Sequence, residues 1–411
     1  MKEIVCDVAV IGGGPAGMAA ALSAAAEGAQ VLLIERNEGL GGILNQCIHD
    51  GFGIHRFGEL LTGPEYAGRF AQQVAAAEGI QVLSHALVTE VGADHTVFCT
   101  TPKGMLTCHA KAIVLAVGCY ERTRGAITIA GTRPAGVYTA GTAQHLINLD
   151  NVAIGKRAVI LGSGDIGLIM ARRLTLEGVE VVCVLEKMPI CNGLPRNVQQ
   201  CLKDFGIPLY LNRTVTELRG RNHLEQVVVC DVDDRGATIP ETTETIDCDT
   251  LILSVGLIPE TELLRSAGLP VARMTNSTPV NSHLETEVAG IFACGNGLHV
   301  NDLVDNVSAE GECAGKWAAR YAAGERAGSA IPVECGTNVR YTMPQTLLPG
   351  ETARLSLRVL REAREQTLVV RGDGDILFSR KLSHVTPAQM VCVELPGIVG
   401  INSGKVEVSV E

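Results

Sequence analysis

Aromatic residues are scarce in this sequence, since Phe, Trp and Tyr make up only 3% of the 411 residues. Positively charged residues are also few: the sequence has 34 Lys and Arg and 45 Asp and Glu, and no basic run occurs. The net charge of −11 makes nucleic acid and anionic membrane surfaces poor partners. No uncharged apolar stretch reaches membrane-spanning length without a glycine turn inside it, so we expect no membrane span.

Paired cysteine motifs are missing as well. The 14 cysteines include no C-x-x-C pair and no closely spaced run, which argues against an iron–sulfur cluster and a disulfide framework. His, Cys and acidic residues show no metal-ligand spacing, so we expect no metal. The first apolar strand begins by Ile4, which leaves no room for a signal peptide, and we therefore expect a reduced, cytoplasmic protein.

Glycine is abundant instead, with 46 residues, and it forms a fingerprint at Gly12-x-Gly14-x-x-Gly17. The motif follows an apolar strand-like run and opens a helix-like run, and a second apolar strand ends in Glu35, 18 residues after the last glycine. In a dinucleotide-binding unit the three glycines permit a tight turn, a close pyrophosphate and close helix packing, and the acid binds the ribose. A glycine-rich turn in an ordinary α/β protein is the simpler alternative.

A second fingerprint, Gly162-x-Gly164-x-x-Gly167, begins 150 residues after the first. Its acid, Glu186, follows the last glycine by 19 residues and disfavours a 2′-phosphate, which favours NAD over NADP. The basic Lys187 directly after it softens that preference, as Arg36 does in the first unit. Two such units indicate two dinucleotides and electron transfer between them.

The remaining patterns predict an α/β protein with two Rossmann-like doubly wound domains and a small C-terminal all-β domain. The strand AIVLAVG ending at Gly118 is repeated by TLILSVG ending at Gly256. A third apolar strand, GIFACGN, completes the first sheet, so the second domain is inserted in the first. We expect residues 80–109 to form a small antiparallel insert and residues 126–150 to be a link. The predicted domains are 1–125 with 286–330, then 150–257, and a β-sandwich-like 331–411 with a hairpin at Asp373-Gly374.

These motifs resemble the flavoproteins with two dinucleotide-binding domains, the pyridine nucleotide oxidoreductases that include thioredoxin reductase and glutathione reductase, over about residues 4–325. The resemblance implies FAD in the first domain and NAD(H), rather than NADP, in the second. It implies FAD contacts at Gly12, Gly14, Pro15, Ala16, Gly17, Glu35, Arg36, Gly41, Gly42, Ala116, Gly118, Gly295, Asn296, Asn306 and Val307. It implies NAD contacts at Gly162, Gly164, Asp165, Ile166, Gly167, Glu186 and Gly256.

The chain departs from that family at two places. Asn296 stands where the family usually has an aspartate that bonds the flavin ribityl chain, and an amide can still accept and donate hydrogen bonds. Disulfide reductases carry two cysteines after the glycine pair that corresponds to Gly41-Gly42, or a C-x-x-C in the NAD domain, whereas only Cys47 is present here. A dithiol relay is therefore not expected. Cys47 with His49, which would lower the thiol pKa, is a candidate redox thiol, and a buried structural cysteine is the favoured alternative.

Further positions leave alternatives open. His299 either bonds the flavin or enters the following helix. Asp302 and Asp305 contact the flavin or, as the better alternative, cap that helix. Glu121 and Arg122 either line a nicotinamide cleft or form a surface ion pair.

The resemblance predicts an FAD-dependent oxidoreductase that passes a hydride between NAD(H) and FAD and exchanges electrons with a partner protein or small molecule. The segments GGILNQCIHDGFG and CGNGLHVNDLVDNVS look most like bacterial oxidoreductases that accompany glycerol-3-phosphate or amine dehydrogenase-like partners. The alternatives are an amine, imino-acid or polyol dehydrogenase subunit, and an electron-conduit subunit without turnover of its own. A homo-oligomer is compatible with the sequence, and the C-terminal β domain is a candidate docking or dimerisation surface.

Overall fold

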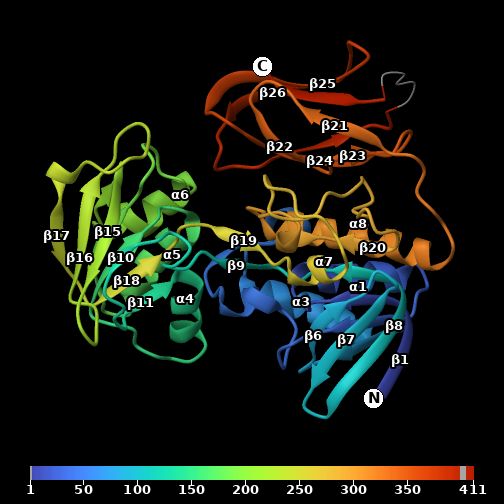
Figure 1. The fold of residues 1–411 in the computed structure, drawn as a ribbon, viewed down its shortest axis with the longest axis horizontal. Coiled ribbons are helices and arrows are strands. Elements are labelled where there is room, and N and C mark those ends of the chain that lie inside the picture. Colours follow the sequence, from blue (N-terminus) through green and yellow to red (C-terminus); the bar gives the residue numbers. More distant parts are fainter. Residues whose placement is uncertain (1, 399–403) are drawn as a thin grey trace. The chain divides into compact units, whose positions relative to one another are not determined.

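The computed structural model describes residues 2–398 and 404–411, and these residues form two compact units (Figure 1). The first unit contains the described residues up to Cys119 and from Pro259 onward, and the second runs from Tyr120 to Ile258. The second unit is therefore inserted into the first. The chain crosses between the units at β9 (Cys119–Glu121) and β19 (Leu257–Pro259).

The first unit is built on a sheet with the order β5-β2-β1-β8, in which β20 also pairs with β8. All of these strands are parallel, and β1, β2 and β8 are largely buried apolar runs, as a sheet covered on both faces requires. The main elements are β1 (Lys2–Ile11), α1 (Pro15–Ala26), β2 (Val31–Ile34), α3 (Gly63–Ala76), β5 (Ile80–Leu83), β6 (Leu87–Val91), β7 (Thr96–Thr101), β8 (Gly104–Leu115), α7 (Glu262–Ser266), β20 (Ile291–Ala293) and α8 (Val304–Ala322). Short elements follow β2: a 3₁₀ turn (Gly42–Gln46), β3 (Asp50–Phe52), α2 (Ile54–Phe57) and β4 (Leu61–Thr62).

The insert expected at residues 80–109 is smaller than the sequence predicts. β5 lies in the parallel sheet, where Val31 pairs with Ile80, and only the β6–β7 and β7–β8 pairs are antiparallel. The two runs expected as separate strands between Met105 and Leu115 are one strand, β8, because no Gly or Pro interrupts them. The first half of β8 pairs with β7, and its end pairs with β20.

Helices α1 and α8 pack directly against each other in the first unit. A Cβ atom at Gly311 or Gly315 of α8 would lie 2.1 Å from the carbonyl oxygen of Ala16 or Ala20 of α1, so these glycines allow the two backbones to touch. This contact joins the helix of the first fingerprint to the segment that follows β20. Among the described residues, no helix, including the 19-residue α8, is long and apolar enough to cross a membrane.

The second unit repeats the parallel sheet, with the strand order β11-β18-β12-β13-β14. Residues 126–150, expected as a link, instead supply an edge strand of this sheet and a helix, because Val137–Thr139 pairs with β18. The elements are β10 (Ala130–Gly131), β11 (Val137–Thr139), α4 (Ala140–Asn148), β12 (Arg157–Leu161), α5 (Asp165–Leu176), β13 (Glu180–Leu185), α6 (Pro195–Asn197) with a π turn (Val198–Leu202) and a 3₁₀ turn (Lys203–Phe205), β14 (Leu209–Tyr210), β15 (Arg213–Arg219), β16 (Gln226–Asp231), β17 (Glu244–Asp247) and β18 (Thr250–Leu253). Strands β10, β15, β16 and β17 form a separate sheet.

Residues 331–398 and 404–411 form two β-sheets around their own apolar core, which is contributed by inward residues such as Leu355, Leu368 and Val408. The alternation of apolar and polar residues predicts these strands, and the hairpin of β25 and β26 turns at Asp373-Gly374. The strands are β21 (Ile331–Cys335), β22 (Val339–Met343), β23 (Thr346–Leu347), β24 (Ala353–Val359), β25 (Ala363–Gly372), β26 (Asp375–Val385), β27 (Val391–Leu395) and β28 (Val406–Val410).

Candidate functional site

The first glycine turn is a tight connection between β1 and α1. Gly12 has φ +103°, and a Cβ there would lie 2.4 Å from the carbonyl oxygen of Ala116. A Cβ at Gly17 would lie 1.7 Å from the carbonyl oxygen of Gly12. By contrast, no described atom lies within 4 Å of a Cβ at Gly14, the residue before the first amides of α1. The turn therefore leaves open space at an uncapped helix N-terminus, which fits a pyrophosphate.

Glu35 points back into this turn from the end of β2. Its side chain is 4% exposed, and its two oxygens accept hydrogen bonds from the backbone N–H groups of Gly13 and Asn37, both at 2.7 Å. Each carboxylate oxygen retains a lone pair for a further donor such as a ribose hydroxyl. Arg36, the next residue, is exposed.

The glycine pair after β2 closes over the same turn. The backbone N–H of Gly41 donates to the carbonyl of Gly13 at 2.8 Å. A Cβ at Gly42 would lie 3.1 Å from the Cα of Gly14. Each contacting pair is 28 residues apart in the sequence, and the fold brings the two glycines together.

The strand ends of β8 and β20 meet beside the turn. Gly295 has φ +66°, and a Cβ there would lie 2.8 Å from the Cβ of Ala16. A Cβ at Gly297 would lie 3.3 Å from the N and O atoms of Gly118. The segments expected to bind FAD, 116–118 and 295–296, thus converge at the carboxyl ends of parallel strands, where open α/β sheets bind ligands.

Helix α8 begins without the side-chain caps that the sequence predicts. Leu303 occupies the N-cap position, and no described side chain caps it. Asp302 instead forms an ion pair with Arg358 of β24, and Asp305 accepts a hydrogen bond from the backbone N–H of His55 at 3.1 Å. The prediction that both aspartates cap α8 is therefore wrong, because their carboxylates bind groups from segments distant in the sequence.

Asn306 and Val307 lie in the first turn of α8, next to the C-terminal domain. The Asn306 amide accepts a hydrogen bond from Arg354 at 2.5 Å and donates to the Cys392 thiol at 3.7 Å, while Val307 is buried. The C-terminal domain therefore contacts the helix end that the resemblance places at the flavin.

Cys47 is buried in the loop between the glycine pair and β3. Its thiol donates to the carbonyl oxygen of Ile43 at 3.3 Å, and burial raises its pKa to about 12. The ring of His49 lies against Phe52, with centroids 5.0 Å apart. The expectation that His49 lowers the Cys47 pKa is wrong, since desolvation raises that pKa.

We expect the Cys47 thiol to resist alkylation near neutral pH, because thiolate is the reactive form and a pKa of about 12 leaves almost none of it. Iodoacetamide labelling followed by peptide mass spectrometry would measure this, with the exposed Cys335 as an internal control that is labelled first. A Cys47→Ser protein should keep NADH-driven flavin reduction. Preferential labelling of Cys47 after reduction by NADH would contradict the expectation.

The second glycine turn repeats the geometry of the first. Gly162 has φ +105°, and a Cβ there would lie 1.9 Å from the carbonyl oxygen of Ser254, while a Cβ at Gly167 would lie 2.5 Å from that of Gly162. Beside Gly164 the space is open, since the nearest described atom is the Ser254 hydroxyl oxygen at 3.9 Å. The N-terminus of α5 thus also fits a pyrophosphate.

Glu186 and Asp165 organise the second turn. Glu186 is 5% exposed and accepts the backbone and hydroxyl hydrogens of Ser163 at 2.9 and 2.6 Å. Asp165 accepts from the backbone of Leu194 at 2.8 Å and from Asn197 at 2.6 Å, so it ties the loop after β13 to the turn. Ile166 follows Asp165 in the first turn of α5, and Lys187 is exposed.

Glu121 and Arg122 both make hydrogen bonds inside the second unit, and their expected place in a nicotinamide cleft stays a prediction. Glu121 accepts a hydrogen bond from the backbone of Gly141 at 2.8 Å, at the start of α4. The backbone N–H of Arg122 donates to the carbonyl of Gly256 at 3.0 Å, and Gly256 has φ +106° after β18.

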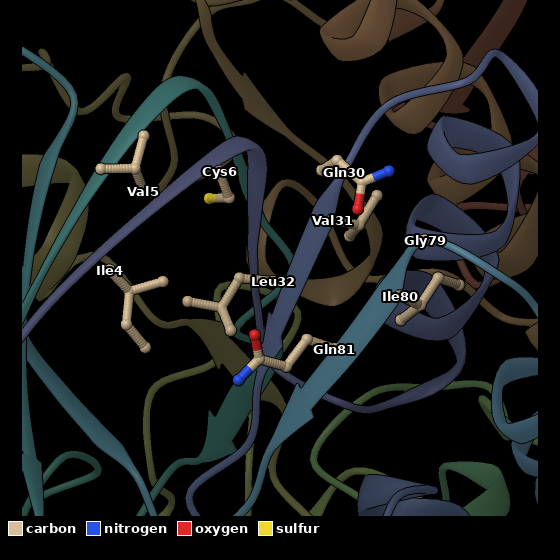
Figure 2. A pocket seen from close by; sticks show the side chains of 9 residues that line it. All are labelled: Ile4, Val5, Cys6, Gln30, Val31, Leu32, Gly79, Ile80 and Gln81. Carbon is tan, nitrogen blue, oxygen red and sulfur yellow. The ribbon is translucent and has the colours of Figure 1, made fainter.

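A separate pocket lies at the other end of β1 from the glycine turn, and Figure 2 shows the side chains that line it. The lining residues come from β1, β2, β5 and the segments before β2 and β5: Ile4, Val5, Cys6, Gln30, Val31, Leu32, Gly79, Ile80 and Gln81. The Sγ atom of Cys6 lies 3.6 Å from that of Cys108 in β8. Because the pocket residues Ile4, Val5 and Cys6 lie in the first half of β1 and Gly12 follows its end, this pocket is distinct from the dinucleotide site.

Sequence reasoning missed two polar residues beside Gly295. Glu310 of α8 is 7% exposed and accepts the Gly295 backbone N–H at 2.8 Å and His299 Nε2 at 2.7 Å. Asn301 donates to Glu310 at 3.3 Å. The available signal is that two glutamates, Glu310 and Glu312, stand among the small residues of AEGECAG, since small neighbours allow close packing that buries one of them.

Both a protein-family model and individual known proteins are similar to this chain. The family model described as pyridine nucleotide-disulphide oxidoreductase matches residues 6–325. An opine oxidase subunit of Agrobacterium tumefaciens (strain Ach5) is 27% identical over 72% of this chain and 61% of its own length. A ferredoxin–NADP reductase of Halalkalibacterium halodurans is 26% identical over 72% of this chain and 86% of its own length.

Solved structures share the fold. Thioredoxin reductase of T. acidophilum has a TM-score of 0.64 at 24% identity, covering 77% of this chain and 98% of that one. A NAD-dependent persulfide reductase of A. fulgidus has a TM-score of 0.60 at 19% identity, covering 89% of this chain and 68% of that one. The alignment with the opine oxidase protein, in contrast, spans less than two thirds of that protein.

Proposed function

Because the chain belongs to the pyridine nucleotide-disulphide oxidoreductase family, we propose that it passes a hydride between NAD(H) and bound FAD and exchanges the electrons with a partner protein or small molecule. Members of this family are FAD- and NAD(P)-dependent oxidoreductases, and this chain is one of them. The observation that carries the proposal is the pair of glycine turns, each with open space at an uncapped helix N-terminus and a buried glutamate beside it.

The two turns take different dinucleotides in this proposal. Gly41-Gly42 and the 295–297 segment close over the first turn, which supports lasting FAD binding there. FAD supplies the hydride acceptor chemistry when bound, and the residues around the turn bind and orient it. In the second turn, Glu186 supports NAD(H) over NADP(H), because a 2′-phosphate would meet a buried carboxylate.

We propose that no dithiol relay follows the flavin. Cys47 is the sole cysteine shortly after the glycine pair, and its raised pKa keeps it protonated. The electrons therefore go to a second protein or a small molecule, and the C-terminal β domain is the proposed docking or dimerisation surface.

Anaerobic mixing of the purified holoprotein with NADH tests the proposal, and we expect the visible absorbance of the flavin to disappear. NADPH should reduce the flavin less effectively, because Glu186 disfavours its 2′-phosphate. Flavin that stays oxidised in excess NADH would reject the proposal.

A second candidate function rests on the relation to the opine oxidase protein. As part of a dehydrogenase, the chain would be reduced by an amine, imino acid or polyol. Flavin reduction by such compounds, without a response to NADH, would select this function. Reduction only in a co-purified complex would instead select an electron-conduit role.

A further inference from the structure

Three buried polar atoms without a hydrogen-bond partner occur in the short segment between β20 and α8 and in the first turn of that helix. Among the described residues, five buried side-chain atoms lack a partner, and three of these belong to His299, Asn301 and Asp305. An unpaired buried polar group destabilises a protein, because it loses its hydrogen bonds to water without gaining others. Their concentration here points to a polar molecule that binds beside this segment in the working protein.

Glu310 holds two of these residues in place. One carboxylate oxygen accepts His299 Nε2 at 2.7 Å, and Asn301 Nδ2 lies 3.3 Å from both oxygens. The same carboxylate accepts the backbone N–H of Gly295 at 2.8 Å. His299 is 1% exposed and Glu310 is 7% exposed, so the network is shielded from water.

The hydrogen bonds to Glu310 define the chemistry of the two free atoms. Because His299 donates through Nε2 and Asn301 through Nδ2, the unpaired atoms are His299 Nδ1 and Asn301 Oδ1. An amide oxygen is always an acceptor, and the second ring nitrogen of a neutral imidazole is one as well. With His299 neutral, the two atoms therefore require N–H or O–H donors.

This network is continuous with residues expected to bind FAD. The backbone N–H of Asn301 donates to Oδ1 of Asn296 at 3.0 Å, and Gly295 is held directly by Glu310. The C-terminal domain covers the segment, since Arg358 donates to the Val300 carbonyl at 3.2 Å. The ring of Tyr341 stands edge-on to His299 with centroids 6.3 Å apart.

We propose that His299 Nδ1 and Asn301 Oδ1 accept hydrogen bonds from N–H or O–H groups of bound FAD, and that Glu310 is the positioning residue for both. This inference rests on the FAD site of the proposed function. An amine or polyol reductant offers the same donor chemistry, but the direct bonds to Asn296 and Gly295 favour FAD as the source.

FAD affinity and the flavin midpoint potential test the inference without NADH. The potential is measured by anaerobic photoreduction of the holoprotein against a reference dye. We expect His299→Leu and Asn301→Leu each to weaken FAD binding at least tenfold or to change the ratio of oxidised to reduced flavin tenfold, about 30 mV for a two-electron couple. His299→Gln, whose amide still offers a donor and an acceptor, should keep most of the FAD affinity and a potential near that of the original protein.

Glu312→Gln is the matched control, since Glu312 lies on the same helix but pairs with Arg56, outside the network. It should leave affinity and potential unchanged. The inference would be overturned if His299→Leu and Asn301→Leu proteins fold and keep the FAD affinity and the flavin potential of the original protein. Slower reduction of these proteins by an amine or polyol, with both quantities unchanged, would also overturn it. If NADH does not reduce the flavin of the original protein but the two leucine variants still shift the potential in the photoreduction experiment, only the proposed function would be rejected.

Discussion

A Gly17→Ala protein is expected to lose FAD and about 3 kcal/mol or more of the free energy of unfolding, the upper end of the usual range for overpacking. The added Cβ would lie 1.7 Å from the carbonyl oxygen of Gly12 and 2.9 Å from its carbonyl carbon. Backbone atoms in a tight turn cannot move aside as a flexible side chain can. The helix α1 must therefore shift away from β1. This shift disrupts the packing of α1 and also displaces its N-terminal amides.

The FAD-to-protein ratio after purification and the thermal unfolding midpoint measure this effect. Gly68→Ala is the control, because Gly68 lies in α3 and no described atom approaches a Cβ there within 4 Å. Alanine is favoured over glycine in a helix by about 1 kcal/mol, so this control should be unchanged or slightly more stable. A Gly17→Ala protein with full FAD content and an unchanged midpoint would show that the turn relaxes more easily than its geometry indicates.

A Gly164→Val protein is expected to remain folded and keep FAD while its affinity for NADH falls on the order of 100-fold, equivalent to about 2.7 kcal/mol. Gly164 has φ −65° and ψ 162°, an extended conformation that valine adopts without strain. The space beside it is open in the protein alone, with the nearest described atom at 3.9 Å. The valine side chain would fill that space, which the pyrophosphate of NAD(H) needs.

Titration of the flavin absorbance with NADH measures the loss, and photoreduction without NADH provides the control, because it bypasses the second turn. Gly164→Ala should give a smaller loss, since one methyl group fills less of the space. Equal NADH affinity in all three proteins would place the pyrophosphate elsewhere.

The dinucleotide-binding units were predictable because their signals are local. A strand, a glycine turn, a helix and an acid occur within about 30 residues, and each glycine position reflects a backbone contact made inside that unit. The strands of the C-terminal domain were predictable for the same reason, since alternation reports which face of a strand is buried. β5 was misplaced because an isolated apolar run does not reveal whether its partner lies in a hairpin or in a distant parallel strand.

The amino-acid sequence by itself determined the two βαβ units, their acids Glu35 and Glu186, the absence of a cysteine pair and the all-β character of residues 331–411. Only the tertiary structure decided which side chains are buried and what they meet. Burial raised the Cys47 pKa, which the sequence had predicted to be lowered by His49. Asp302 and Asp305 bind groups from distant segments and do not cap α8. Glu310 became the centre of a polar network because α8 packs its small residues against α1, close to Gly295. Such contacts join positions far apart in the chain, and no local pattern records them.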